Sequence, residues 1–132
     1  MGVVTETFTL RNPLLRDSPS VEARALVDTG CSELCIPESL YAQLGPETQE
    51  VVAVSRADDS VKFVRKVGPV EIRFKERSGW CYALVMGDQV LVGVLPLETM
   101  NLVIVPKTQT LEYNPRHHFV TSVFSVSACR DR

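Results

Sequence analysis

Apolar residues recur in short runs along most of the chain, and residues with turn chemistry separate these runs. Residues 3–12 are rich in β-branched side chains and alternate as a strand does, and residues 21–27 predict a second strand after a turn. Further strands are predicted at residues 34–36, 51–56, 61–67, 70–74, 80–86, 90–95, 102–105 and 110–113. So many short strands with closely spaced turns favour a mostly-β, barrel-like domain.

One clear helix and one shorter helical stretch fit between these strands. Residues 37–46 predict a short helix, since Pro37 suits the first helical position and Gly45-Pro46 stops the helix. Glu38 adds a negative charge at the positive end of the helix dipole. A later stretch, residues 96–100, is long enough for one or two helical turns.

Turn signals divide the middle of the chain. Ala57-Asp58-Asp59-Ser60 lies between the strands at 51–56 and 61–67, which predicts a β-hairpin with an aspartate in the left-handed conformation. Gly68-Pro69 is expected to end the second strand of this hairpin, because both residues break regular strands. Residues 76–79 are expected to form the turn into the next buried strand.

The bulk properties are ordinary for a soluble globular protein. A chain of 132 residues suits one domain, predicted at residues 1–118, and residues 119–132 form a tail that could add a strand or a dimer-edge strand. A net charge of −2 favours neither a nucleic acid nor an anionic membrane as partner. No apolar run approaches the roughly 20 residues of a membrane span, and the first residues lack the features of a signal peptide.

The cysteine pattern bears on compartment and on metal binding. Four cysteines are present, namely Cys31, Cys35, Cys81 and Cys129. They show no C-x-x-C pair, so we expect reduced thiols in a cytoplasmic protein. A zinc site would combine Cys31 and Cys35 with His117 and His118, but adjacent histidines lack the gap of the usual zinc motifs. The sequence therefore predicts neither a metal nor a cofactor.

The strand at residues 21–27 ends on an acid. Ala25-Leu26-Val27 precedes Asp28, and Thr29-Gly30 follows it before the next apolar run begins. A lone charge beside a hydrophobic core is costly without partners. Asp28 is therefore the candidate catalytic residue of the chain.

Three features follow one another in a characteristic order. They are Leu26-Val27-Asp28-Thr29-Gly30-Cys31, the hairpin around Asp58-Asp59, and Val90-Leu91-Val92-Gly93 before a short helix. Together they resemble the retropepsin-like aspartic proteases, the single-domain homodimeric group that includes retroviral proteases. The stretch from Gly93 to His117 is most similar to prokaryotic members. The resemblance covers residues 3–116 and implies the closed β-barrel of the acid protease fold, in a homodimer.

The resemblance implies that peptide bonds are hydrolysed between two carboxylates. Two neighbouring carboxylates cannot both ionise, so one activates water as a base and the other protonates the amide as an acid. The chain holds one Asp-Thr-Gly, so the second carboxylate must be Asp28 of another subunit across a two-fold axis. By the same resemblance, Thr29 supports the loop between subunits and Gly30 allows close backbone approach. Cys31 and Ser32 are expected to contact substrate.

The resemblance also makes the hairpin of residues 55–62 a flap that closes over bound peptide and excludes water. The expected substrate-contacting residues of its tip are Ala57, Asp58 and Asp59. The expected pocket residues beside the carboxylate pair are Leu91, Val92 and Gly93, the last letting the chain cross closely. Flaps of the family usually carry a glycine near the tip, and this tip has none.

Two alternatives belong to other functional classes. The glycine-free tip favours a catalytically silent module of the same fold, which binds peptide or mediates dimerisation without hydrolysis. A cysteine hydrolase would pair Cys31 with His117 or His118, but no orienting acid is evident. The main prediction is an aspartic endopeptidase whose partners are a second copy of the chain and a peptide or protein substrate.

Overall fold

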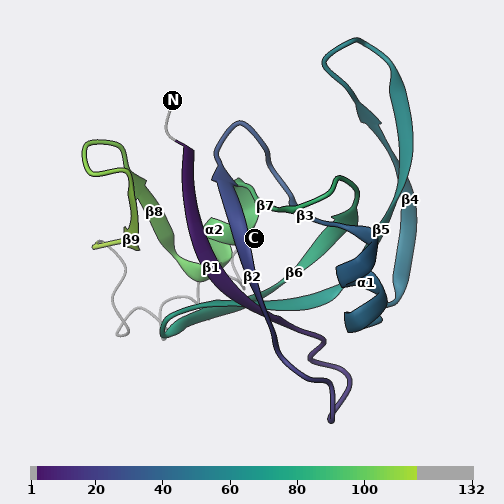
Figure 1. Ribbon diagram of the computed structural model, residues 1–132, viewed down its shortest axis with the longest axis horizontal. Helices are drawn as coiled ribbons and strands as arrows, with labels where there is room; N and C mark the ends of the chain where they lie inside the picture. The colour runs from purple at the N-terminus through teal and green to yellow at the C-terminus, as the bar shows by residue number, and fades with distance from the viewer. Residues whose placement is uncertain (1–2, 116–132) are drawn as a thin grey trace, which may run out of the picture.

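The computed structural model describes residues 3–115, which form a mostly-β domain with two short helices (Figure 1). In chain order its elements are β1 (Val3–Arg11), β2 (Val21–Asp28), β3 (Leu34–Ile36), α1 (Glu38–Leu44), β4 (Thr48–Ser55), β5 (Val61–Phe74), β6 (Arg77–Val85), β7 (Val90–Val92), α2 (Val94–Met100), β8 (Leu102–Val105) and β9 (Thr110–Tyr113). The predicted fold class, a closed mostly-β barrel with one or two short helices, is confirmed. The tail predicted at residues 119–132 lies outside the described residues.

Six strands close into a mixed barrel. Hydrogen bonding follows the order β1-β2-β7-β3-β6-β5, and β5 also pairs with β1, which completes the ring. The pairs β2–β7 and β3–β6 are parallel. β4 extends the sheet beyond β5, and the hairpin of β4 and β5 projects away from the barrel (Figure 1). β8 and β9 form a separate two-stranded sheet.

Alternate side chains of the strands fill the barrel. Phe8 and Leu10 of β1 are completely buried, as are Val27 of β2 and Val92 of β7. The ring of Phe8 lies 5.5 Å from that of Phe74, a contact between β1 and β5. Successive strand residues point to opposite faces, so the alternation in the sequence becomes one apolar face toward a common core.

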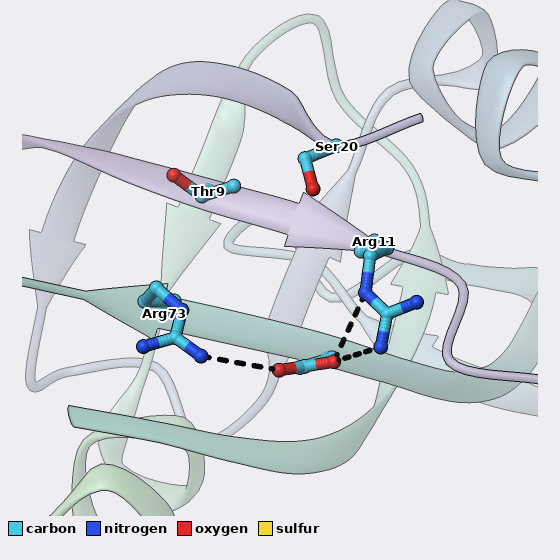
Figure 2. A pocket seen from close by; sticks show the side chains of 5 residues that line it. Thr9, Arg11, Ser20 and Arg73 are labelled. Atoms are coloured by element: carbon cyan, nitrogen blue, oxygen red, sulfur yellow. Dashed lines mark hydrogen bonds and ion pairs between the residues drawn. The ribbon is translucent and has the colours of Figure 1, made fainter. Parts of the chain in front are cut away.

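Arg11 and Glu71 mark the seam where β1 meets β5. They are opposite each other in the register, and Arg11 donates two hydrogen bonds to Glu71 Oε1, at 2.7 and 3.2 Å. Arg73 Nη2 lies 3.8 Å from the other carboxylate oxygen. Figure 2 shows these side chains lining a pocket of about 190 Å³ with Thr9 and Ser20. Because the Glu71 carboxylate lies between the two guanidinium groups, we assign this cluster to closure of the barrel.

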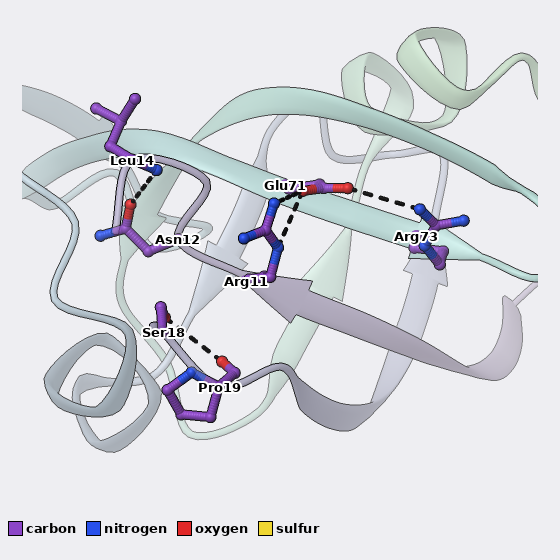
Figure 3. Close-up of polar contacts among 7 residues, drawn as sticks. All are labelled: Arg11, Asn12, Leu14, Ser18, Pro19, Glu71 and Arg73. Atoms are coloured by element: carbon purple, nitrogen blue, oxygen red, sulfur yellow. Dashed lines mark hydrogen bonds and ion pairs between the residues drawn. The ribbon is translucent and has the colours of Figure 1, made fainter. Parts of the chain in front are cut away.

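Asn12 follows the seam and fixes the β1–β2 loop. Its side-chain oxygen accepts the backbone N–H of Leu14 at 3.0 Å (Figure 3), and its amide nitrogen donates to the carbonyl of Leu44 at 3.1 Å. Asn12 is buried, and a buried amide is tolerated when it is hydrogen-bonded. The contact ties the loop to the end of α1.

The predicted strand break at Gly68-Pro69 is wrong. β5 continues from Val61 to Phe74, with a register shift against β6 between Val67 and Val70. Proline is tolerated in a strand at such a bulge, because the ladder does not need its missing N–H there.

Two further boundaries lie earlier than the sequence predicts. The turn after β5 is at residues 75–76, and Gly79 lies within β6. A Cβ atom on Gly79 would lie 3.1 Å from the carbonyl oxygen of Thr99, so this glycine allows α2 to pack closely on β6. α2 begins at Val94. Pro96 fits its first turn, because the first N–H groups of a helix have no partner within the helix.

Candidate active site

Asp28 is the last residue of β2, and strand pairing sets its neighbour. β2 and β7 run parallel with Val27 opposite Val92, so Asp28 and Gly93 follow side by side at the ends of adjacent strands. Asp28 is half-buried, whereas Thr29 is exposed. The acid therefore lies at the rim of the core, where its carboxylate is accessible.

The loop of residues 29–33, which follows Asp28, is held against the start of α2. Three successive backbone N–H groups donate to three carbonyls of this loop. These bonds run from Gly93 to Glu33 (3.1 Å), from Val94 to Cys31 (2.9 Å) and from Leu95 to Ser32 (2.9 Å). The first N–H groups of a helix have no partner within the helix, so the carbonyls of the loop supply the hydrogen-bond acceptors that the start of α2 needs.

Gly93 crosses this loop at contact distance, as the sequence leads one to expect. A Cβ atom at this position would lie 2.5 Å from the carbonyl oxygen of Cys31 and 2.6 Å from that of Glu33. Real Cβ atoms essentially never approach backbone atoms so closely. A side chain at residue 93 would therefore displace the loop that carries the candidate site.

The Asp28 carboxylate is oriented by its own loop. Within residues 3–115 its hydrogen-bond partner is the backbone N–H of Gly30, which donates to Oδ1 at 2.8 Å. The N–H of Cys31 donates to the backbone carbonyl of Asp28 at 3.1 Å. A Cβ atom on Gly30 would lie 3.1 Å from the same Oδ1, so the small residue keeps this space open. The backbone of the loop therefore fixes the orientation of the carboxylate.

A second apolar cluster, here called the cleft cluster, connects this loop with the β4–β5 hairpin. Its members are buried Cys35, Val64 and Leu84 with half-buried Cys31, Val52, Val54, Met86 and Leu91. Cys31 belongs to the loop, whereas Val52 and Val54 come from one face of β4. The cluster is separate from the barrel core and carries partly exposed apolar surface beside Asp28.

Alternation along β7 separates the predicted pocket residues. Leu91 is half-buried in the cleft cluster, and its role as a pocket residue stays a prediction. Val92 is completely buried in the barrel core, and its side chain offers no surface to a substrate. The expectation that Val92 walls the pocket is therefore wrong for this chain, because adjacent strand residues face opposite sides of the sheet.

The predicted flap tip is an exposed turn closed by its own hydrogen bonds. Asp58 Oδ1 accepts the backbone N–H and the hydroxyl of Ser60, at 3.0 and 2.6 Å. Both hydrogen bonds lower the pKa of Asp58 below its ordinary value, and the bond from the hydroxyl has the larger effect. Asp59 has φ of +67°, so an aspartate occupies the left-handed position that favours glycine. Ala57, like both aspartates, is exposed and belongs to no cluster with Asp28.

Thr29 faces a different surface from the cleft cluster. It lines one part of an apolar groove of about 360 Å³ between α2 and β8. The other lining residues are Val94, Leu97, Glu98, Leu102, Val103, Ile104 and Pro106. Ser32, which the sequence places with the substrate contacts, is exposed on the same loop. The loop therefore has one side toward the cleft cluster and one toward this groove.

Sequence reasoning missed the hairpin stem as part of the site. Val52, Val54 and Val64 line the cleft cluster, whereas the prediction concerned only the tip residues. The signal was the alternation in β4, where Val52 and Val54 share one face of the strand. Met86, at the end of β6, gave no such signal.

The described residues offer no metal site. No three His, Cys, Asp or Glu side chains within residues 3–115 gather closely enough to hold an ion. In the same part of the chain Cys31, Cys35 and Cys81 are free thiols. His117, His118 and Cys129, which the zinc and cysteine-hydrolase alternatives involve, lie outside it. None of the helices found between residues 3 and 115 is long and apolar enough to cross a membrane.

The sequence matches no protein-family model and no curated protein. Among solved structures, the chain is similar to the protease of simian foamy virus (mac), determined in solution. The two are 12% identical, the match covers 70% of this chain and 92% of the viral one, and the TM-score is 0.49. At this identity and TM-score the likeness assigns neither a family nor an activity to the chain.

Proposed function

We propose that the protein is an aspartic endopeptidase, a hydrolase that cleaves peptide bonds between Asp28 of two subunits. The observation that carries this proposal is the setting of Asp28. The half-buried Asp28 carboxylate lies at the end of β2, where a firmly held loop begins, near an apolar cluster that includes residues of the projecting hairpin. One carboxylate cannot be base and acid in the same step, so a second copy supplies the other across a two-fold axis.

The chemistry follows from two carboxylates at close range. They share one proton, because two like charges at that distance cannot both persist, and they titrate as a pair. The ionised group takes a proton from water as the water oxygen attacks the peptide carbonyl carbon. The protonated group gives its proton to the carbonyl oxygen, and a proton then reaches the departing amine. The Gly30 N–H at 2.8 Å keeps the Asp28 carboxylate oriented during these steps.

The groove between α2 and β8 is the proposed seat of the second copy. It begins at Thr29, the residue next to Asp28, and its walls are mainly apolar. Val103 and Ile104 of β8 are half-buried there. An exposed apolar surface beside half of a site is suited to a self-complementary contact, which would bring the two Asp28 residues together.

The cleft cluster is the proposed binding surface for the substrate. Cys31 and Leu91 offer apolar surface beside Asp28, and Val52 and Val54 continue it along the hairpin. An extended peptide with apolar side chains around the cleaved bond fits this surface. The hairpin would cover the peptide and exclude water, which strengthens the electrostatic interactions of the carboxylate pair.

Substitution of Asp28 by asparagine tests the activity. Asp28→Asn should lower peptide cleavage by about 10³-fold or more, because neither the base nor the shared proton remains. Cleavage of a broad peptide library between acid and neutral pH measures this, and sedimentation equilibrium measures assembly. Asp17→Asn, a change of an exposed aspartate in the β1–β2 loop, is the matched control. Cleavage that survives Asp28→Asn would overturn the proposal.

The proposed seat of the partner is tested separately. Val103→Glu should convert the dimer to monomer and abolish cleavage, since a charge would be buried against its symmetry mate. Leu14→Glu is the control, because Leu14 is an apolar residue of the β1–β2 loop with 59% of its surface exposed. If Val103→Glu remains dimeric, the partner sits elsewhere, whatever the outcome for Asp28.

A silent peptide-binding or dimerisation module is the second candidate. The observation in its favour is the tip, where Ser60 donates to Asp58 and the turn is closed without glycine. This candidate predicts dimerisation without turnover of any peptide tested. Cleavage that is sensitive to pepstatin would exclude it.

We also propose a cytoplasmic location, where Cys31, Cys35 and Cys81 would stay reduced. Alkylation of intact cells after rapid acid quenching should find these thiols free. Thiols that are oxidised under ordinary growth would argue for another compartment.

A further inference from the structure

Two thiols share the cleft cluster beside the candidate catalytic loop. Cys31 packs against the small buried group formed by Cys35, Val64 and Leu84, and the two cysteines are four residues apart in the chain. The Cys31 thiol lies 3.5 Å from the carbonyl oxygen of Glu33, to which it donates. Cys31 follows the Asp-Thr-Gly motif, and Cys35 lies in β3. Peptide hydrolysis as proposed above uses neither thiol.

The two thiols differ in access. Cys31 is half-buried at the margin of the cleft cluster, so it is the more accessible of the two to a small molecule. Cys35 is only 7% exposed. Its pKa is raised to about 12, mainly because burial disfavours the charged thiolate and secondly because the Cys31 thiol is near. Because Cys31 is the less buried of the two, it is the residue that meets an oxidant, and Cys35 is the one that follows. Cys81 is also a free thiol, but it packs against the barrel core instead.

We propose that Cys31 and Cys35 form a redox-active pair, which low-molecular-weight disulfides such as oxidised glutathione convert to an intramolecular disulfide. The Cys31 thiolate attacks one sulfur of the oxidant, the oxidant's S–S bond breaks, and one glutathione thiolate leaves. The Cys35 thiolate then attacks the Cys31 sulfur and releases the second glutathione. Two protein thiols are oxidised, one small disulfide is reduced to two thiols, and the two protons end on the released glutathione.

The backbone contacts of Cys31 connect this bond to the candidate site. The N–H of Cys31 donates to the carbonyl of Asp28 at 3.1 Å, and its own carbonyl accepts from Val94 at 2.9 Å. A covalent link from Cys31 to Cys35 would move the Cys31 sulfur from the cleft toward β3 and shift both contacts. A displacement of about 1 Å in a catalytic group can cost about 10²-fold in rate. This consequence, though not the disulfide itself, rests on the proposed endopeptidase function.

The thiol chemistry is tested on the full-length folded chain carrying Cys81→Ser and Cys129→Ser. After oxidised glutathione, intact mass should show the loss of two hydrogens with no glutathione retained, and dithiothreitol should reverse the change. Adding Cys35→Val should leave one glutathione on Cys31, and adding Cys31→Ser should prevent reaction. Peptide mapping of the unsubstituted chain should locate the same bond, which guards against a variant that fails to fold.

Two results would overturn the pair. One is a chain that has both thiols and retains glutathione on Cys31. The other is a chain that stays reduced under conditions that modify the Cys35→Val variant. The disulfide should also form in the Asp28→Asn variant, so it can be measured whether or not the protein cleaves peptides. If the protein cleaves peptides, formation of the disulfide should lower the rate of cleavage by about 10²-fold. In the Cys35→Val variant the oxidant leaves only the glutathione adduct on Cys31, so the rate should fall only by the amount that the adduct itself causes.

Discussion

The end of β2 with the loop that follows it, residues 28–33, and the hairpin tip of residues 56–60 both carry aspartates, yet they are held differently. The loop is held by distant parts of the chain, since its carbonyls accept N–H groups from the start of α2 and Gly93 crosses it at contact distance. The tip is held by hydrogen bonds among its own residues. Its hydrogen bonds join Arg56 to Ser60, Asp59 to Arg56 and Ser60 to Asp58.

This difference suits the two roles proposed for these segments. A catalytic carboxylate needs a fixed position, and the α2 contacts of the loop supply it. A covering hairpin has to move when peptide enters and leaves, and a tip that depends on no other element can do so without unfolding the barrel. Perturbations of the loop should therefore spread to the whole domain, and those of the tip should remain local.

Gly93→Ala should cause the largest loss of stability, because the added methyl group would disrupt the close contact between residue 93 and the loop. The added Cβ would lie 2.5 Å from the carbonyl oxygen of Cys31, and backbone on both sides leaves little room to yield. We expect a loss of at least about 3 kcal/mol in the free energy of unfolding, measured by urea titration. Gly45→Ala is the control, since Gly45 has a positive φ but open space around it and should cost only about 1 kcal/mol. If Gly93→Ala and Gly45→Ala lost the same free energy of unfolding, the close contact of Gly93 would not be what holds the loop.

Asp59→Val should give a smaller and local effect. Valine is strained at a φ of +67°, but residues 56–60 are exposed, and the hydrogen bonds that hold the tip within residues 3–115 join its own residues. We expect about 1 kcal/mol or less in urea unfolding, together with faster proteolytic nicking between β4 and β5. Asp59→Gly, which relieves the strain, should be as stable as the natural chain or slightly more so. A loss for Asp59→Val as large as that for Gly93→Ala would show that the tip is not independent.

The smallest effect is a pH dependence confined to the tip. The pKa of Asp58 is lowered from 3.8 by the hydrogen bonds from Ser60, so these bonds stabilise the turn above the ordinary value. The stabilisation is lost as pH falls through the lowered pKa. The Ser60 amide resonance should therefore shift with a midpoint below 3.8. Ser60→Ala should move the Asp58 midpoint upward, and a midpoint above 3.8 in the natural chain would contradict the assignment.

The element types were largely predictable from local pattern, and the continuity of β5 was not. Gly68-Pro69 breaks most strands, and sequence reasoning ends the strand there. In the structure the N–H of Gly68 donates to the carbonyl of Glu47 at 2.9 Å, and the side chain of Gln49 donates to the carbonyl of Gly68 at 2.8 Å. These partners lie about twenty residues away in the chain, so no local signal could reveal that they would support the bulge.

The pocket residues show the same limit on a smaller scale. The sequence predicts an apolar strand at residues 90–95, of which the structure has Val90–Val92, and because every side chain in this run is apolar the alternation has no visible phase. Pairing with β2 on one side and β3 on the other decides that Val92 faces the core and Leu91 the cleft. The register, and with it the pocket, is a property of the sheet.

The sequence by itself determined Asp28-Thr29-Gly30 at the end of an apolar strand and a glycine at residue 93, because strand propensity and turn chemistry act over a few neighbouring residues. Only the tertiary structure decided that the N–H groups of α2 hold the Asp28 loop and that Cys31 and Cys35 share an apolar cluster with the hairpin. These contacts exist because closing the barrel places β2, β7 and β3 side by side, and that pairing joins segments about sixty residues apart.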